Sequence, residues 1–168
     1  MYAPAQALIA ELEAEAAATR RVLERVPADR LEWRPHPKSM TLGQLAHHVA
    51  TIPGRVTSMA RGDGFDASTA KFLPDQPESA ASLLPDLEAS VAGARQFLSE
   101  LTEDTAGAPW HMRKGDQPVF TVPRIGVVRT VALNHWYHHR GQLLVYLRLL
   151  DVPVPVVYGR SADENPFA

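Results

Sequence analysis

The chain has 168 residues with 17 basic and 19 acidic side chains and a formal net charge of -2, which argues against nucleic acid or an anionic membrane as a partner. Because cysteine is absent, disulfides, thiolate metal sites and a cysteine nucleophile are excluded, and His, Asp and Glu are the available strong metal ligands. We expect a single cytoplasmic domain spanning residues 1–168, because neither a signal-peptide pattern nor an apolar run of bilayer length is present.

Two helices are predicted in the first 60 residues. Apolar side chains recur at helical spacing over residues 5–26, and Pro27 ends this pattern. Residues 28–40 contain two prolines and are typical of a loop. A capping-box pattern follows, in which Thr41 and Gln44 can each accept a hydrogen bond from the other's backbone N–H. This pattern predicts that the second helix begins there.

The second helix separates two adjacent histidines. At about 100° per residue, its apolar face is formed by Leu45, His48, Ile52, Val56 and Met59. His48 is therefore expected to point into the core, and His47 to lie at the edge of the core. Pro53 cannot donate to the Val49 carbonyl, so a kink is expected at this point. A freed carbonyl beside a buried histidine is compatible with a cavity.

The remaining residues predict two more helices and three connecting or terminal segments. Residues 61–78 are polar and form a long surface crossover, and a third helix covers residues 82–101. Residues 105–122 indicate a small hairpin or an irregular loop. A fourth helix over residues 123–150 is apolar around most of its circumference and should be central. The tail, residues 151–168, should be extended and pack on the helices, which gives an all-α four-helix bundle.

Two histidines of the fourth helix have the spacing of metal ligands. His135 and His139 are four residues apart, so their Cβ atoms lie about 5 to 6 Å apart on one face and both rings can reach one ion. His48, from the second helix, can supply a third nitrogen. The stripe that contains the pair is Val128, Val131, His135, His139, Gln142 and Tyr146. Spacing alone leaves open a second reading, in which these are core histidines that hydrogen-bond one another without a metal.

Other polar side chains near these histidines receive more modest roles. His138 is placed at the rim of the helix interface. It is a candidate general base, as are His47 and Tyr146. Gln142 and Tyr146 are more typical of side chains that fill the core. Arg140 is expected to pair with a carboxylate at the surface of the bundle.

The two histidine blocks also carry a family resemblance. The segments TLGQLAHHVA and LNHWYHHRGQLLVYLRLL, at residues 41–50 and 133–150, resemble the DinB-like (damage-inducible) family of bacterial four-helix-bundle proteins. Residues 33–40 and 152–167 are also similar to one bacterial branch of that family. The resemblance implies a divalent metal bound by three histidines, which fall at His48, His135 and His139, and a homodimer. Characterised members include S-transferases and an isomerase that depend on low-molecular-weight thiols, whereas many members have no known reaction.

These observations lead to one preferred function and one alternative. The preferred function is a metal-dependent enzyme, a thiol S-transferase or hydrolase, in which zinc or nickel, or alternatively iron or manganese, activates a thiol or water. Its small electrophilic substrate would enter between residues 28–40, residues 105–122 and the tail. The alternative is a stress-related protein that binds a metal or small ligand without catalysis.

Overall fold

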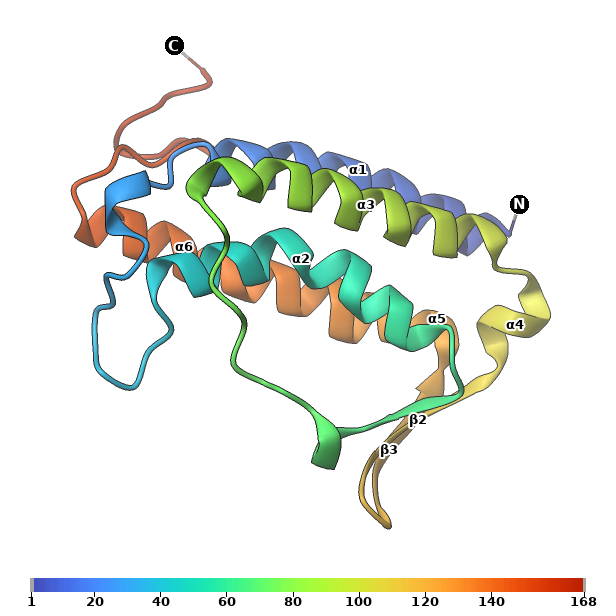
Figure 1. Ribbon diagram of the computed structural model, residues 1–168. Helices are drawn as coiled ribbons and strands as arrows, with labels where there is room; N and C mark the ends of the chain where they lie inside the picture. Colours follow the sequence, from blue (N-terminus) through green and yellow to red (C-terminus); the bar gives the residue numbers. More distant parts are fainter. Residues whose placement is uncertain (1, 168) are drawn as a thin grey trace.

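Four long helices form two layers in the computed structural model, which describes residues 2–167 (Figure 1). Helix α1 (Ala3–Leu23) lies beside α3 (Leu83–Glu100), and α2 (Leu42–Ala60) lies beside α6 (Asn134–Leu149). Contacts between α2 and α3 join the two layers. Leucine, valine and alanine side chains of all four helices form the core between the layers. The predicted four-helix arrangement is therefore present.

The capping box predicted at the start of α2 is confirmed. The backbone N–H of Gln44 donates to Thr41 Oγ1 at 3.1 Å, and the backbone N–H of Thr41 donates to Gln44 Oε1 at 3.0 Å. The side-chain amide of Gln76, in the crossover that follows β1, donates to the same Thr41 oxygen at 2.7 Å. The cap that begins α2 therefore also anchors the crossover against this helix.

A small sheet corrects the prediction of a purely all-α fold. Strands β2 (Pro109–Lys114) and β3 (Gln117–Pro123) form the antiparallel hairpin that was one of two predictions for this region. Strand β1 (Gly64–Asp66) pairs in parallel with β2 and places Gly64 opposite His111. A Cβ atom at Gly64 would lie only 2.4 Å from the His111 carbonyl oxygen, so glycine is needed for this pairing. The short β1 lies in the segment predicted to be a polar crossover.

The helix predicted over residues 123–150 is not continuous. It is divided into α5 (Arg124–Val127), a π-helical segment (Val128–Leu133) and α6. A π-helical turn holds more residues than an α-helical turn, so the period of 3.6 residues assumed for residues 123–150 does not apply within residues 128–133. The buried side chains of α6 are Trp136, Arg140, Leu143 and Leu147. Val145 and Leu149 are exposed, so part of the apolar surface of this helix, which was predicted to be central, faces outward. No helix among residues 2–167 is long and apolar enough to cross a membrane.

Arg140 pairs with a carboxylate, as predicted, but in the interior and not at the surface. Its side chain is 2% exposed, and its guanidinium lies 2.5 Å from Glu15 Oε2. It also donates to Thr19 Oγ1 at 3.1 Å and to the hydroxyl of Tyr158. The Tyr158 hydroxyl donates to the same Glu15 oxygen at 2.8 Å. Because Tyr158 belongs to the C-terminal tail, this network connects the tail to α1 and α6, and the predicted packing of the tail on the helices is confirmed.

Candidate metal centre

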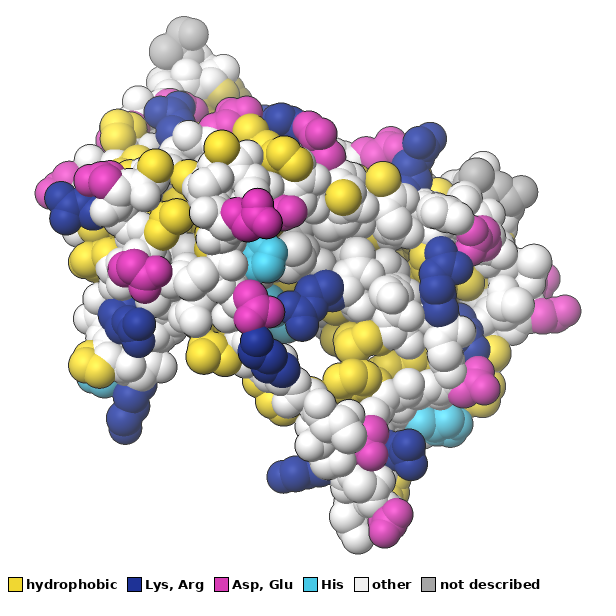
Figure 2. Space-filling model, viewed as in Figure 1, with side chains coloured by type: hydrophobic (Ala, Val, Ile, Leu, Met, Phe, Trp, Pro, Cys, Tyr) yellow, Lys and Arg dark blue, Asp and Glu magenta, His cyan; other side chains and the backbone are white. Residues whose placement is uncertain are grey.

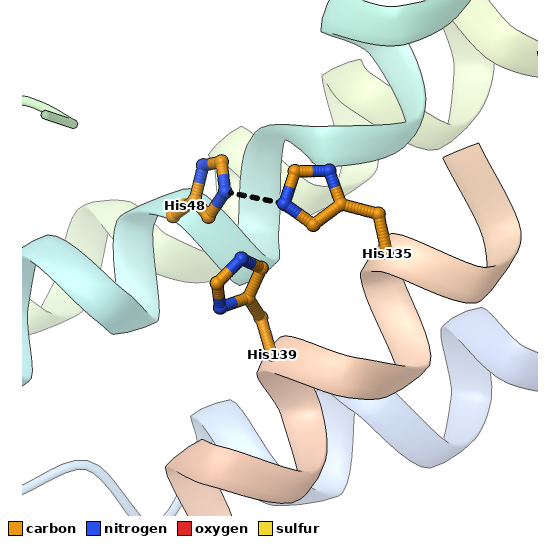
Figure 3. A group of neighbouring side chains, drawn as sticks. All are labelled: His48, His135 and His139. Carbon is orange, nitrogen blue, oxygen red and sulfur yellow. Dashed lines mark hydrogen bonds between the residues drawn. The ribbon is translucent and has the colours of Figure 1, made fainter. Parts of the chain in front are cut away.

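Three histidines from two helices meet at the side of the α2–α6 interface. His48 projects from α2, and His135 and His139 project from successive turns of α6, so that their rings face one another (Figure 3). Each side chain offers a nitrogen, and these three nitrogens lie within 4.8 Å of one another. The Nε2 atoms of His48 and His135 are 3.3 Å apart. The structure thus brings together the three side chains selected from the sequence.

A hydrogen bond one residue away sets the register of the two helices. Pro53 has no N–H to donate to the Val49 carbonyl, and the indole N–H of Trp136 donates to this carbonyl at 2.7 Å instead. Val49 follows His48 and Trp136 follows His135, so the same contact holds the two histidines opposite each other. The carbonyl that Pro53 frees is therefore bonded to α6 and does not open onto a cavity.

The three imidazoles are neutral at pH 7. Burial, followed by the electrostatic effects of His139 and His135, lowers the pKa of His48 to about 3. Burial also lowers the pKa of His139 to about 4, although its hydrogen bond to Gln142 acts in the opposite direction. The pKa of His135 is lowered by burial and by His138. Neutral imidazole is the form that binds a metal ion, so protons do not compete with a metal near pH 7.

Gln142 orients the ring of His139. Its Oε1 atom lies 2.7 Å from His139 Nδ1, and because an amide oxygen only accepts, Nδ1 must carry the proton. The lone pair of His139 is therefore on Nε2. Metal-binding histidines commonly hold their second N–H in this way. The sequence-based interpretation of Gln142 as core filler is wrong, since the side chain is exposed. The position of Gln142, three residues after His139 on the same helix, could have indicated this contact from the sequence.

Replacing Gln142 should weaken metal binding without removing it. We expect Gln142→Ala to lower zinc affinity about tenfold, because the His139 ring loses the acceptor that fixes its orientation. Gln142→Glu retains an acceptor and should bind zinc at least as tightly as the original protein. Gln6→Ala, at another exposed helical glutamine, is the matched control. Competition with a zinc-binding dye measures the zinc affinity of the original protein and of the three variants. An unchanged affinity in Gln142→Ala would contradict the proposal that Gln142 orients His139.

The triad opens onto a cavity of about 370 Å³. The cavity lies among α2, the crossover, strand β2, the π-helical segment and α6, and Figure 2 shows hydrophobic and basic side chains beside the hollow between the helices and the crossover. The lining residues are Met40, His48, Ile52, Arg55, Val56, Met59, Phe65, Ala70, Lys71, Phe72, Met112, Val131, His135 and His139. Met40 and Met112 come from the two loop regions predicted to flank the entrance. The tail was predicted to form the third side of the entrance, but its described residues supply no lining residue. The crossover forms that side of the cavity instead.

The three candidates for a general base lie outside this lining. His47 Nδ1–H donates to the Asp75 carbonyl at 3.0 Å, and its Nε2 is 3.8 Å from Asp86 Oδ2. His138 is exposed, and its ring stacks edge-on against His139 with a centroid separation of 4.9 Å. Tyr146 donates its hydroxyl to the Met40 carbonyl at 3.3 Å. Each side chain therefore has a contact directed away from the cavity or lies at the helix surface, and a catalytic role stays a prediction.

The donor set and the separation of His48 from His135 fit a divalent metal ion. Two nitrogens bound at 2.0 to 2.1 Å to one tetrahedral ion are about 3.3 to 3.4 Å apart. The His48–His135 separation of 3.3 Å has this value. Three neutral imidazoles suit zinc and nickel, and also iron and copper. The residues present could therefore hold a divalent metal without a change in the α2–α6 register.

Comparison with known proteins places this site in a family. The sequence pattern of the DinB superfamily matches residues 11–143, which include all three histidines. The chain belongs to the DinB superfamily. The chain is also similar to the uncharacterized protein YrdA of Bacillus subtilis (strain 168), with 25% identity over 159 residues. That match covers 90% of this chain and 86% of YrdA.

Solved DinB structures have the same fold. The crystal structure of a DinB-like protein from Bacillus cereus ATCC 10987 has a TM-score of 0.68 and 25% identity, and covers 91% of this chain and 97% of that one. The crystal structure of a DinB-like protein from Bacillus subtilis has a TM-score of 0.67 and 19% identity, and the match covers 92% of this chain and 99% of that one. The crystal structure of a putative member of the DinB family from Exiguobacterium sibiricum 255-15 has a TM-score of 0.63 and 20% identity, and the match covers 90% of this chain and 95% of that one. The names of these relatives specify a family and a fold but no reaction.

Proposed function

We propose that this DinB protein is a metal-dependent enzyme that transfers a low-molecular-weight thiol to a small electrophile. His48, His135 and His139 would hold a divalent zinc or nickel ion. The observation that carries the proposal is a triad of neutral imidazoles facing a largely apolar cavity of about 370 Å³. Pockets of this size and character are typical of small-molecule sites.

The composition of the triad supports a catalytic site over a structural one. Structural zinc sites usually have four protein ligands, whereas catalytic sites have three and leave a position for substrate or water. Within residues 2–167, no acidic side chain joins the three histidines as a further ligand. A bound metal would supply Lewis acidity that lowers the pKa of a thiol or water toward neutrality.

The cavity lining favours a thiol over water as the nucleophile. The lining residues include no carboxylate, the most direct candidate for a base that would deprotonate water. A free thiol has a pKa of about 8.5, compared with 15.7 for water, so a thiol needs much less assistance to ionise. The side chains of Ile52, Val56 and Val131 line the cavity together with the triad and would leave less room for water beside the reacting groups.

A metal-reconstitution assay tests this proposal. Protein purified without a histidine tag is analysed for metal, stripped with a chelator and reloaded with zinc or nickel. The reloaded protein should consume a thiol in the presence of monobromobimane at least about tenfold faster than the stripped protein, with one of a panel of low-molecular-weight thiols. If metal binds stoichiometrically but changes only stability, the non-enzymatic alternative holds. If no metal binds, the metal-free arrangement of hydrogen-bonded histidines holds.

A further inference from the structure

The cavity beside the triad carries positive charge on one side. We infer that its ligand is an amphiphilic anion whose negative group is bound by Arg55 and whose apolar body lies against the methionines. This inference rests on the proposed function, since it specifies the substrate or thiol cosubstrate of the same site. It follows from the charges of the lining, the placement of Arg55 on α2 and the composition of the apolar wall.

The charged lining residues outside the triad are Arg55 and Lys71, and no acid accompanies them. Lys71 forms an exposed ion pair with Asp75, four residues later in the crossover, so an anion at Lys71 would compete with that carboxylate. For Arg55, by contrast, the hydrogen bonds and ion pairs found among residues 2–167 include no side-chain partner. Asp75 acts on Arg55 only at longer range. One cation at the cavity is therefore available to an incoming anion.

Helix geometry places Arg55 on the same face of α2 as His48. The two residues are seven positions apart, which corresponds to about two turns and about 10 Å along the axis. Ile52 lies between them, and both Ile52 and Arg55 line the cavity together with His48. A ligand with its reacting group at the triad would extend along this face, past Ile52, toward the Arg55 guanidinium. This arrangement suits a molecule with its anionic group at the end opposite the reacting group.

The apolar wall of the cavity is rich in methionine. Three of the four methionines in the chain, Met40, Met59 and Met112, line it, together with Phe65 and Phe72. Methionine is unbranched and polarizable, so methionine-lined surfaces adapt to apolar groups of different shape. The wall is therefore suited to a range of aliphatic or aromatic bodies. The fixed element of selectivity is the charge contributed by Arg55.

Matched naphthalene probes test this inference. 1-Naphthalenesulfonate carries a negative charge and binds metals weakly, and 1-(methylsulfonyl)naphthalene is its neutral counterpart of similar size. Calorimetric titration at low ionic strength should show that the sulfonate binds the zinc-loaded protein about tenfold tighter than the sulfone. Arg55→Met should remove most of this preference while sulfone binding stays the same. Arg55→Lys should retain much of it, and Arg160→Met, at an exposed arginine of the tail outside the cavity, should retain all of it.

Several outcomes would overturn the inference. They are an undiminished preference in Arg55→Met, tighter binding of the sulfone than of the sulfonate, or no measurable binding of either probe at millimolar concentration. The same titrations on metal-stripped protein separate this inference from the proposed function. If the protein shows the Arg55-dependent preference but supports no thiol turnover, the proposed reaction is contradicted and the anion site is supported. If the protein supports thiol turnover but shows no such preference, the proposed reaction is supported and the anion site is contradicted.

Discussion

His135→Ala is expected to lower zinc affinity at least about a hundredfold. Loss of a residue that only orients a ligand already lowers affinity about 10- to 100-fold, and loss of a ligand should exceed this. The substitution leaves two imidazoles, His48 and His139, and removes the nitrogen that lies 3.3 Å from His48 Nε2. Zinc affinity is measured by competition with a chelating dye, and metal content by elemental analysis after dialysis.

His138→Ala is the matched control for this prediction. His138 has the same chemistry on the same helix and touches the His139 ring, but it is exposed and lies outside the cavity lining. Its removal should change zinc affinity only slightly. Thermal unfolding gives a second measurement, because zinc at 100 times its Kd stabilises a protein by about 2.7 kcal/mol. This stabilisation should be lost in His135→Ala alone, and equal losses in both variants would refute the ligand assignment.

Arg140→Met should destabilise the protein by about 3 to 5 kcal/mol, the usual effect of removing one member of a buried ion pair. The remaining Glu15 carboxylate is 14% exposed and would lose its cationic partner, although the Tyr158 hydroxyl would still donate to it. Thr19 and the Glu15 carbonyl would lose donors as well. Glu15→Gln should also be strongly destabilising, because the Arg140 charge then stays buried and unbalanced. Urea denaturation measures the free energy of unfolding.

Arg20→Met provides the comparison at an exposed ion pair. Arg20 and Glu88 form a surface pair with side-chain exposures of 40% and 63%, and such pairs contribute about 0 to 1 kcal/mol.

The double substitution Arg140→Met with Glu15→Leu should recover much of the stability lost in Arg140→Met, because no unbalanced charge is left in the interior. A loss below about 1 kcal/mol in Arg140→Met would show that the buried network contributes no more than the surface pair.

Much of the candidate site could be predicted because helical spacing is a local property. The 100° rule alone selects His48 over His47, and a separation of four residues pairs His135 with His139. The capping pattern at Thr41 fixes where α2 begins and therefore which of its residues face α6. The assumption that two buried-face histidines on different helices meet was then sufficient to assemble the triad.

Features that depend on distant segments could not be predicted in this way. Strand β1 has only three residues, and its pairing with β2 depends on a neighbour far along the chain. The π-helical segment has no pattern of its own, so the division of the last predicted helix at residues 128–133 was not predicted. The burial of Arg140 requires Glu15 and Tyr158 from opposite ends of the chain. The crossover wall of the cavity likewise depends on where Gln76 anchors that segment.

The Trp136–Val49 hydrogen bond has a consequence for how tightly an ion can be held. Both partners are uncharged and buried, and their contact contains no metal ligand, so the α2–α6 register does not depend on an ion. An arriving ion would therefore meet a ready-made donor set, and little of its binding free energy would be consumed in ordering the protein. Exchange of one metal for another should likewise leave the helices in place, with selectivity determined by the imidazoles and not by refolding.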